Sequence, residues 1–588
     1  MKPPVSKRKT LILHPEDGLQ SFASRGQYDR IVDLGRASDA TYEGWGQHLG
    51  CEVVGIHEFA DQNEDLHVIR SLLRMGIGRL TDRSGVDWWS VLSPWVVPQL
   101  SQLILIQRLA KYMGHEEGEV YSSRPDYRSV ALGRLLGGRL INLETSFQKA
   151  TRRVRHYSGV AAKFNSGQIF QIAQDKYDRE HAIRRRFAKR PQTISGPLIL
   201  LPSAYINVSR TALSYARLLP DDQFMLVCAR DSARVPDLPA NVQMISLDSY
   251  FASPNSSEIS SLLEAWDRLK SYLVRSAPEH QSAAAAGTFD RMPSLIRWGI
   301  TIRDAWKRLF EAHDFRSCLS ADHNNPYTRI PLLLAKRAGI PAVACHHGAL
   351  DATLALTTHD ADFYVAKTEM ERDYMKEVCG VPPEKILSAA PASLAEPHSR
   401  PSGSSEKRWL VFFSEPYGIS GWRVDEVYGE LLPHLYSLAE TCGLKLVFKL
   451  HPFETAKSHH RLLLRHLSEE KVRQIEIITG PIPQELWQRT HFALTVESSV
   501  AVECSERGIP VFLCGWLRDS FSGYVQQFQR FRVGQILATA AQIEDIPRLL
   551  RLSPLRSGEA RNQSNPNDVE TLREALGITH SLPLAARG

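Results

Sequence analysis

Two adjacent serines stand where an apolar strand meets a helix in the C-terminal third of the chain. In TVESSVAVECSERGIPVFLCG, the strand ends at Val496, Ser498 and Ser499 follow, a helix begins, and Gly508 leads into the next strand. Free backbone N–H groups and the helix dipole attract a phosphate at such a point, and the serine hydroxyls add donors. Glu503, one turn along the helix, is placed to reach a ribose diol. The alternative is that the serines only cap the helix, but the complete arrangement favours a nucleotide site.

A histidine and a proline end another apolar strand. In LVFKLHPFE, the strand runs directly into Lys449, His451, Pro452 and Glu454. The proline stops the strand and fixes the turn, which places His451 at the carboxyl edge of a sheet. There His451 can donate to a phosphate oxygen and, if protonated, neutralise its charge. We therefore predict that Lys449, His451 and Pro452 belong to the nucleotide site; the alternative is a histidine in a structural turn.

A third group of polar residues follows two strands in the middle of the chain. The segment GIPAVACHHGALD places His347 and Gly348 in a turn after a strand, with Asp351 within reach. Glycine permits the unusual backbone angles that present side chains from a tight turn. One histidine or aspartate here, His347 or Asp351 above all, could deprotonate a hydroxyl, and a structural role for each is the open alternative. The preceding loop, SADHNNPYTR, adds Asp322, His323, Asn324 and Arg329.

Other patterns do not support a site of their own. Asp360 and Asp362 have the spacing of a metal-nucleotide motif, but they lead into the strand FYVAK, where aspartate more often ends a turn. Neither GxGxxG nor a P-loop appears in the chain, so NAD-dependent and ATP-hydrolysing activities lack their usual motifs. We predict no metal and no cofactor.

Short β-branched runs alternate with helix-length amphipathic segments through most of the chain, which is the pattern of parallel α/β sheets. Ligands bind beyond the carboxyl ends of the strands in such sheets, so two consecutive sheets predict one site between them. The expected strands form three blocks: residues 10–15, 30–35, 51–56, 118–123 and 138–144; residues 196–203, 224–230, 242–247, 317–323, 341–348, 363–367 and 386–391; and residues 409–416, 444–454, 475–480, 492–499 and 509–516.

Composition marks the boundaries between the blocks. We predict an N-terminal α/β domain of unknown role (1–145), a basic helical connector (146–190), a Rossmann-like acceptor-side domain (191–395), a linker (396–407) and a second Rossmann-like domain (408–580). The connector is either a solvated linker helix or a binding segment for anionic lipid or glycan. The second interpretation is possible because each Lys or Arg of a basic cluster near a membrane surface contributes roughly 1 kcal/mol to binding. The basic residues of the connector include Arg184, Arg185, Arg186, Lys189 and Arg190.

Bulk composition narrows the class of protein. Of the 588 residues, 43% are hydrophobic and 23% are charged, which is close to the average for globular domains. The net charge of +6 is small for this length and does not indicate a nucleic-acid binder. The eight cysteines form no CxxC pair, which indicates a reducing compartment. With no signal peptide and no apolar run of ~18 residues, we predict a cytoplasmic protein, at most peripherally attached to the inner face of the cytoplasmic membrane.

Three motifs carry a resemblance to known enzymes. SSVAVECSERGIPVF resembles the nucleotide-binding segment of GT-B glycosyltransferases, where a small-residue turn holds the donor phosphates and a helix glutamate holds the ribose. The His-Pro element with a downstream Ser-Ser is similar to bacterial sialyltransferases, polysialyltransferases and related capsule enzymes, which implies that His451 contacts the nucleotide phosphate and supports the leaving group. The turn at His347 and Gly348 resembles the acceptor-side domain of capsule and teichoic-acid transferases. The triplet Glu16-Asp17-Gly18 resembles a sialyltransferase signature but stands in the wrong block.

The resemblance implies a GT-B glycosyltransferase, with two facing Rossmann-like domains and an additional N-terminal α/β domain. Such an enzyme moves a sugar from a CMP-, CDP- or UDP-linked donor to a surface polysaccharide or a lipid-linked glycan. Two alternatives stay open. One is a CDP-polyol phosphotransferase of the teichoic-acid type, and the other is a non-catalytic polysaccharide assembly component that retains a GT-B shell.

Overall fold

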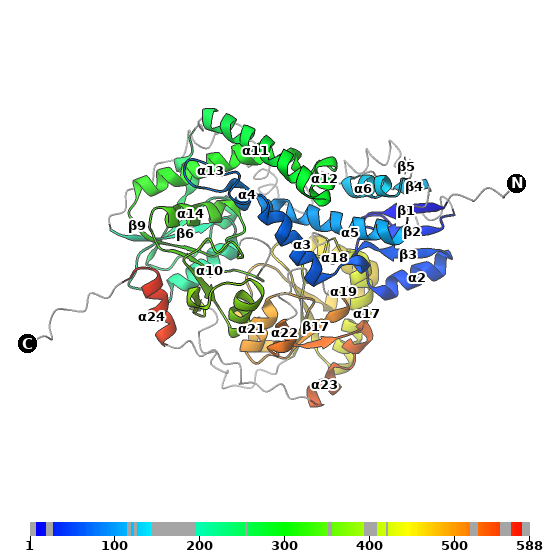
Figure 1. Ribbon diagram of the computed structural model, residues 1–588. Helices are drawn as coiled ribbons and strands as arrows, with labels where there is room; N and C mark the ends of the chain where they lie inside the picture. The colour runs from blue at the N-terminus through cyan, green and yellow to red at the C-terminus, as the bar shows by residue number, and fades with distance from the viewer. Residues whose placement is uncertain are drawn as a thin grey trace, which may run out of the picture.

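The computed structural model arranges the chain in three β-sheets, each flanked by helices (Figure 1). Every pairing between neighbouring strands is parallel among the residues that the structure describes. The parallel α/β class predicted from the alternating pattern is confirmed. The described residues are 8–18, 27–114, 119–122, 126–137, 139–143, 196–252, 256–350, 356–392, 408–418, 421–517, 527–552 and 566–578.

The N-terminal sheet has five strands in the order β3-β2-β1-β4-β5. The chain builds outward on one side of β1 and then crosses to the other, so the strand order reverses between β1 and β4. The strands are β1 (Lys9–Leu13), β2 (Arg30–Asp33), β3 (Glu52–Gly55), β4 (Glu119–Ser122) and β5 (Arg139–Asn142). The helices are α2 (Asp39–Leu49), α3 (Gln62–Arg74), α4 (Trp88–Leu92), α5 (Val97–Met113) and α6 (Tyr127–Leu135).

The central sheet has seven strands in the order β12-β11-β10-β9-β6-β7-β8, and its order reverses between β6 and β9. Its inner strands are largely buried because helices cover both faces. The strands are β6 (Leu198–Ser203), β7 (Phe224–Cys228), β8 (Val242–Ser246), β9 (Phe315–Ser320), β10 (Ala342–Ala344), β11 (Phe363–Ala366) and β12 (Ile386–Ser388). The helices are α10 (Ile206–Ala216), α11 (Ser256–Ser276), α12 (Pro278–Ala285), α13 (Met292–Ala312), α14 (Pro326–Arg337) and α15 (Glu369–Asp373), which continues as a π-helix over Tyr374–Val378.

The third sheet has six strands in the order β15-β14-β13-β16-β17-β18, with the reversal between β13 and β16. Only its edge strand, β18 (Gln535–Leu537), is not predicted from the sequence. The other strands are β13 (Trp409–Phe413), β14 (Lys445–Lys449), β15 (Glu476–Ile478), β16 (Thr490–Thr495) and β17 (Val511–Cys514). The helices are α17 (Val424–Cys442), α18 (Ala456–His466), α19 (Glu469–Gln474), α20 (Gln484–Arg489), α21 (Val500–Glu506), α22 (Gln527–Arg530) and α23 (Ile546–Leu552).

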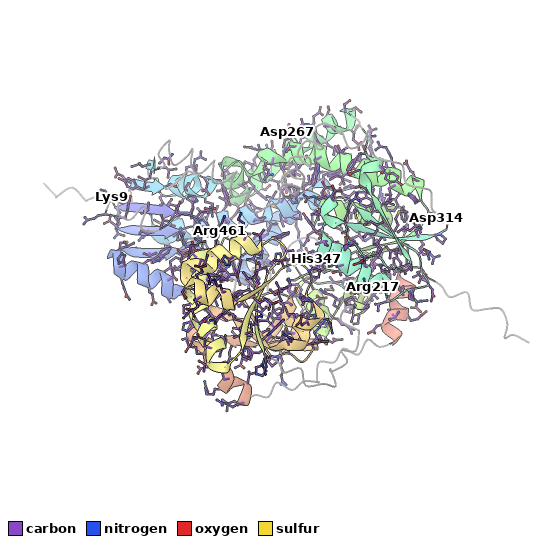
Figure 2. The ribbon with its side chains drawn as sticks, turned by 180° about the vertical axis from the view of Figure 1, so that it is seen from behind. Lys9, Arg217, Asp267, Asp314, His347 and Arg461 are labelled. Carbon is purple, nitrogen blue, oxygen red and sulfur yellow. The ribbon has the colours of Figure 1, made fainter. Side chains whose placement is uncertain are left out.

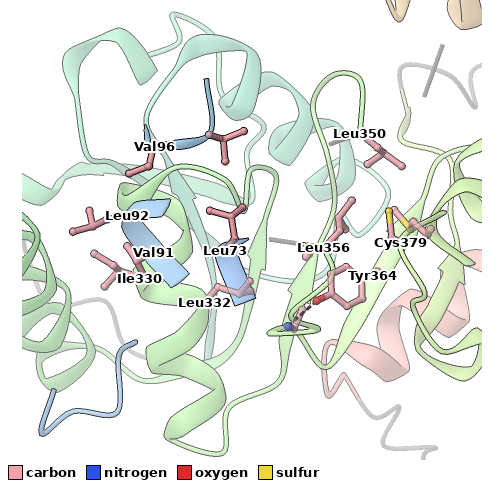
Figure 3. Packing of buried hydrophobic residues seen from close by; sticks show 14 of the residues in the cluster. Leu73, Val91, Leu92, Val96, Ile330, Leu332, Leu350, Leu356, Tyr364 and Cys379 are labelled. Carbon is pink, nitrogen blue, oxygen red and sulfur yellow. Dashed lines mark hydrogen bonds between the residues drawn. The ribbon is translucent and has the colours of Figure 1, made fainter. Parts of the chain in front are cut away.

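Helices of the N-terminal unit share a core with the seven-stranded sheet, so this unit is less separate than predicted. Trp89 of α4 is fully buried and stacks on Trp266 of α11, with ring centroids 6.2 Å apart. Figure 3 shows Leu73 and Leu92 in the same apolar cluster as Ile330 of α14. Large apolar side chains on short helices need cover, and here the neighbouring unit supplies it.

The last helix, α24 (Pro566–Ala575), departs from the position predicted for it. Residues up to 580 are predicted to belong to the third block, but Leu572 and Leu576 are buried in the cluster beneath the seven-stranded sheet. In Figure 1 this helix lies on that unit, far from α23. After the third block, the chain therefore returns to the seven-stranded unit, whose apolar cluster covers the apolar side of α24.

The N-terminal unit also contacts the six-stranded unit through a buried ion pair. Arg423, just before α17, is 1% exposed, and its Nε and Nη2 donate to the two oxygens of Asp33 at 2.7 and 2.6 Å. Its remaining donors bond the carbonyls of Asp17 and His14 at the end of β1. The carboxyl edge of the five-stranded sheet is thus occupied by an arginine from the third block.

No single described helix is long and apolar enough to span a membrane. One pair of consecutive helical segments, Trp88–Trp95 and Val97–Met113, is together long and apolar enough by length and composition alone, but the two segments are bent by 59° relative to each other.

Candidate functional site

The predicted residues lie at the carboxyl edges of the two larger sheets, close to where each strand order reverses. Ser498 and Ser499 follow β16, and His451 follows β14. On the other side, His347 follows β10. Figure 2 shows His347 where the six-stranded and seven-stranded units meet. Ligands of open α/β sheets bind at such reversal points.

The His-Pro turn fixes the tautomer of His451. The backbone N–H of Phe453 donates to Nδ1 of His451 at 3.2 Å, so Nδ1 carries no proton and Nε2 must carry one. The Glu454 carboxylate and the Ser414 hydroxyl accept the backbone N–H of His451 at 3.1 and 3.3 Å, which holds the turn. His451 therefore presents an N–H donor.

His451 is neutral at neutral pH. Burial, followed by the charges of Lys449 and His347, lowers its pKa to about 4. Without a ligand, His451 is therefore a neutral hydrogen-bond donor, and its protonation beside a bound phosphate stays a prediction. The cation beside it is Lys449, which is 6% exposed and donates to the Leu450 carbonyl at 2.8 Å. Pro452 is exposed.

The Ser-Ser turn is held by an acid that the sequence analysis overlooked. The Glu415 carboxylate, just after β13, accepts the N–H of Glu497 at 2.8 Å and the hydroxyl of Thr495 at 3.1 Å. Burial raises its pKa, while hydrogen bonds that include the backbone N–H of Ser498 lower it. Some backbone donors of the turn are thus already used. Its position directly after a strand was the available signal.

The two serines are only weakly engaged as helix caps. Ser499 is the N-cap residue of α21, but its side chain makes no capping hydrogen bond. The Ser498 hydroxyl accepts the N–H of Val500 at a long 3.4 Å. Both residues are half-buried. Capping alone does not account for the pair, and their hydroxyls stay available to a ligand.

Glu503 lies on α21 at the junction between the two units. Its side chain is 39% exposed, and Arg507 lies 3.7 Å from its carboxylate. Burial raises the pKa of Glu503, while Arg507 and Lys367 lower it. Lys367 follows β11 of the seven-stranded sheet and pairs with Glu371 at 3.0 Å. Lys367 is not among the predicted residues, although a lysine that follows an apolar strand repeats the pattern of Lys449.

His347 has the opposite tautomer to His451. Its Nδ1 lies 3.2 Å from the carbonyl of Ala321, which can only accept. Nδ1 therefore carries the proton, and Nε2 has a free lone pair. His347 is half-buried, and its ring stacks on His346 with centroids 5.2 Å apart. His346 is buried, and burial holds its pKa well below the ordinary value.

The residues around the preceding loop divide into structural and unassigned groups. Arg329 is 1% exposed and binds Asp360, the Ser90 hydroxyl at 2.6 Å and the Thr358 hydroxyl at 3.1 Å. Arg329 is one of the candidates predicted beside the His347 turn, but its buried guanidinium joins α4 to the loop before β11. Asp322 accepts the N–H of Asn324 at 3.0 Å, which closes the turn.

His323 and Asn324 retain unused polar atoms. His323 is 3% exposed, and neither ring nitrogen has a hydrogen-bond partner among the described residues; the same holds for the side-chain oxygen of Asn324. Burial lowers the pKa of His323 to about 4. Gly348 does not have a left-handed backbone, and an added Cβ would meet nothing within 4 Å, so the backbone reason given for this glycine is wrong. Asp351 lies outside the described residues.

Three acidic residues that the sequence did not assign to a site, Asp17, Asp360 and Asp362, have hydrogen-bond partners within the fold. Asp360 binds Arg329, and Asp362 accepts the backbone N–H of Ala342 at 3.0 Å. Asp17 accepts the backbone N–H of His14 at 2.8 Å. Across the described ranges, no group of three or more His, Cys, Asp or Glu is arranged to hold a metal ion.

Comparison with known proteins gives structural likeness alone. No family model and no curated protein matches the chain. A co-structure of S. aureus MnaA with UDP aligns with a TM-score of 0.41 at 11% identity, over 65% of this chain and 98% of that one. UDP-GlcNAc 2-epimerase from Neisseria meningitidis bound to UDP-GlcNAc gives 0.41 at 13% identity, over 65% and 100%. The wall teichoic acid polymerase TagF gives 0.37 at 10%, over 71% and 94%. At these values, neither a reaction nor a substrate carries over.

The arrangement defines the class of fold. Two parallel α/β units of the Rossmann-like kind meet where His347 follows β10 (Figure 2), at the carboxyl edge of the seven-stranded sheet. This is the GT-B architecture, and the five-stranded unit is an addition to it.

Proposed function

We propose that this chain is a glycosyltransferase that moves a sugar from a nucleotide-sugar donor to a carbohydrate acceptor. One observation carries the proposal: two histidines of opposite tautomer, His347 and His451, come from facing sheets and lie close enough to interact electrostatically. One ring offers a lone pair and the other offers an N–H. A group transfer from a phosphate-linked donor to a hydroxyl can use both groups, the lone pair as a base and the N–H as a donor to the leaving phosphate.

The roles follow from the tautomers. Nε2 of His347 takes the proton of the acceptor hydroxyl as the new carbon–oxygen bond forms. The bond between the sugar and the donor phosphate breaks, and its electron pair goes to the phosphate oxygen. The Nε2–H of His451 donates to that oxygen and stabilises the charge. Ser498 and Ser499 bind the same phosphate group, and Glu503 binds the ribose. Asp351 stays a second candidate for the base.

The acceptor is proposed to be a surface polysaccharide or a lipid-linked glycan, as the resemblance of the His-Gly turn implies. Action at the inner face of a membrane stays a prediction, because the basic connector (146–190) lies outside the described residues, which begin again at residue 196. Binding of this connector to anionic vesicles at low salt, and its loss at high salt, would support it.

The test compares single-residue variants in a transfer assay. A panel of nucleotides first identifies the ligand that raises the melting temperature, since about 2.7 kcal/mol is added at 100 times Kd. His347→Ala should then slow transfer by about 10²–10⁴-fold without weakening nucleotide binding. His451→Ala should weaken binding and slow transfer by ~100-fold or more, equivalent to about 2.7–4 kcal/mol.

The matched control is His460→Ala, an exposed histidine on α18, which should leave transfer unchanged. Full activity in His451→Ala would contradict the proposed site. Phosphate incorporated into the product would favour the polyol phosphotransferase instead. Nucleotide binding without any turnover would favour the non-catalytic assembly component.

A further inference from the structure

Five side chains form a continuous strip that starts at the carboxyl edge of the seven-stranded sheet, and we call them the aromatic strip: Tyr205, Asn325, Tyr327, Trp298 and Trp95. The Asn325 amide nitrogen donates to the Tyr205 hydroxyl at 3.1 Å, and its oxygen accepts the backbone N–H of Tyr327 at 3.0 Å. The Tyr327 ring meets the Trp298 ring edge to face, with centroids 5.1 Å apart. The ring of Trp298 in turn lies 5.1 Å from that of Trp95, so each member contacts the next.

The aromatic strip leads from the proposed site to the N-terminal unit. Tyr205 follows β6 and Asn325 follows β9, the two strands between which the strand order reverses. Asn325 stands four residues after Ala321, whose carbonyl holds the ring of His347, so the Cα atoms of these two loop residues are no more than about 15 Å apart. At the other end, Trp298 lies on α13 and Trp95 follows α4, and these two helices pack against α14 (Figure 1).

The aromatic strip is open to a ligand. Trp95 is 36% exposed, and the other four side chains are half-buried. The Tyr205 oxygen accepts hydrogen bonds from Asn325 and, at 3.4 Å, from a guanidinium N–H of Arg230. A phenol oxygen has two acceptor positions and one proton, and within the described ranges the O–H of Tyr205 has no acceptor. Tyr205 therefore keeps a hydrogen-bond donor for a bound molecule.

Rings and uncharged polar groups together match the chemistry of a sugar chain. A sugar ring presents C–H groups on its faces and hydroxyls at its edge. The faces of aromatic rings carry partial negative charge and attract such C–H groups, whereas a phenol and an amide hydrogen-bond the hydroxyls. The orientation of the Asn325 amide is fixed, because the backbone N–H of Tyr327 can only donate to its oxygen. Asn325 therefore offers a second N–H besides the one that Tyr205 accepts.

A lipid surface fits the aromatic strip less well. Trp95 ends the first segment of the bent helical pair, but apolar side chains of that pair, such as those of Trp88 and Leu100, are fully buried in the protein. Tyr205 and Asn325, at the other end of the strip, would lose their hydrogen bonds to water in an apolar phase, at a cost in free energy. One exposed tryptophan beside two polar side chains therefore favours a carbohydrate.

We propose that the aromatic strip binds an extended stretch of the acceptor glycan, several sugar units away from the hydroxyl that reacts. This inference rests on the proposed function and narrows the acceptor to an oligosaccharide or polysaccharide chain. It also gives a role to the N-terminal unit, which contributes Trp95 and is an addition to the two Rossmann-like units of the GT-B architecture.

The experiment measures binding of the full-length protein, without nucleotide, to a printed array of bacterial oligosaccharides that range from single sugars to long chains. The wild type should bind long chains but not the single sugars that compose them. For the oligosaccharide that binds most tightly, calorimetry should show that Trp95→Ala and Tyr205→Phe each weaken binding by about 5- to 10-fold, because each variant loses one ring contact or one hydrogen bond. Trp95→Phe keeps a ring and should recover most of the loss.

Transfer kinetics with the same oligosaccharide give a second readout. Trp95→Ala should raise KM for this acceptor by about 5- to 10-fold and leave kcat nearly unchanged, because the contact is equally strong in the ground state and the transition state. Tyr112→Ala is the matched control, because Tyr112 is 60% exposed in the last turn of α5, more than ~20 Å along that helix from Trp95. This control should bind the oligosaccharide as the wild type does.

Three results would overturn the proposed role of the aromatic strip: equal binding of single sugars and long chains, no binding of any oligosaccharide, or unchanged binding in Trp95→Ala. Weaker binding of Trp95→Ala to neutral phosphatidylcholine vesicles, without a loss of oligosaccharide binding, would also overturn it, because Trp95 would then face lipid. The glycosyltransferase proposal would survive all of these results, since it rests on His347 and His451. Oligosaccharide binding that Trp95→Ala weakens, in a protein that transfers no sugar, would refute the transferase and support the strip.

Discussion

Removing the charge of Asp33 should destabilise the protein by more than any surface substitution. Asp33 is fully buried and accepts two hydrogen bonds from Arg423, which is 1% exposed. Tyr42 donates to the same carboxylate at 3.0 Å. Burial alone would lower the pKa of Arg423, but the hydrogen bonds and charge of Asp33 outweigh it and raise that pKa. The folded state therefore depends on the negative charge of Asp33.

The size of the effect follows from what Asp33→Asn leaves behind. A buried guanidinium without its counter-charge costs about 3–5 kcal/mol. The amide oxygen can still accept one hydrogen bond, and the carbonyls of Asp17 and His14 still accept theirs, so we expect about 3 kcal/mol, the lower end of that range. Replacing both partners with apolar residues, in Asp33→Leu with Arg423→Met, should cost less than the single change.

Urea unfolding followed by tryptophan fluorescence measures the difference, because Trp422 and Trp45 lie beside Arg36 and Arg423. The control is Asp425→Asn, which removes an ion pair with Arg465 in which the two side chains are 47% and 57% exposed. An exposed pair of this kind contributes less than about 1 kcal/mol. If the free energy of unfolding of Asp33→Asn lies within about 1 kcal/mol of the wild-type value, the charge of Asp33 does not stabilise the buried Arg423 as we infer.

Three further predictions use other features of the fold. Gly299→Ala should lower the free energy of unfolding by about 1–3 kcal/mol, because an added Cβ would lie 2.2 Å from Trp88. Gly44→Ala has open space around its Cβ and should raise the free energy of unfolding by up to about 1 kcal/mol. The melting temperatures of the two variants should therefore move in opposite directions. Burial lowers the pKa of His280 from 6.5 to about 4, so between these values only the unfolded chain binds the proton. As the pH is lowered from 6.5 towards 4, the free energy of unfolding should therefore decrease by about 1.4 kcal/mol per pH unit through this residue. His280→Phe should flatten the dependence measured between pH 7 and 5. Transfer activity should persist in EDTA, because protein cations neutralise the phosphates, and a strict need for magnesium or manganese would refute this.

The strands were predictable because their chemistry is local. Apolar runs bounded by glycine, proline and charged residues marked all the strands of the first two sheets, including the three-residue β10 (Ala342–Ala344). In the third sheet, β18 (Gln535–Leu537) was not predicted, because this short edge strand begins with a polar residue and lacks an apolar run. The ends of strands also located His451 and Ser498, since the carboxyl edge of a parallel sheet is where ligands bind.

The partners of these residues were not predictable, because they come from distant segments. Arg329 sits in a polar loop that reads as a ligand site, yet the Ser90 and Asp360 groups that bind it lie 239 and 31 residues away in the chain. Glu415 holds the Ser-Ser turn from 82 residues away. Tautomers of His347 and His451 likewise depend on backbone contacts that no sequence pattern specifies.

The attachment of the N-terminal unit bears on how the two halves of the site can move. On one side its helices share an apolar core with the seven-stranded sheet. On the other side it contacts the six-stranded unit through the buried ion pair of Arg423 and Asp33. A ligand shifts a conformational equilibrium only by the difference between its affinities for the two states, and the proposed nucleotide site does not include the N-terminal unit. We therefore expect the buried pair to stay closed when the nucleotide binds, so that the two halves bind the donor in the orientation that the N-terminal unit already sets.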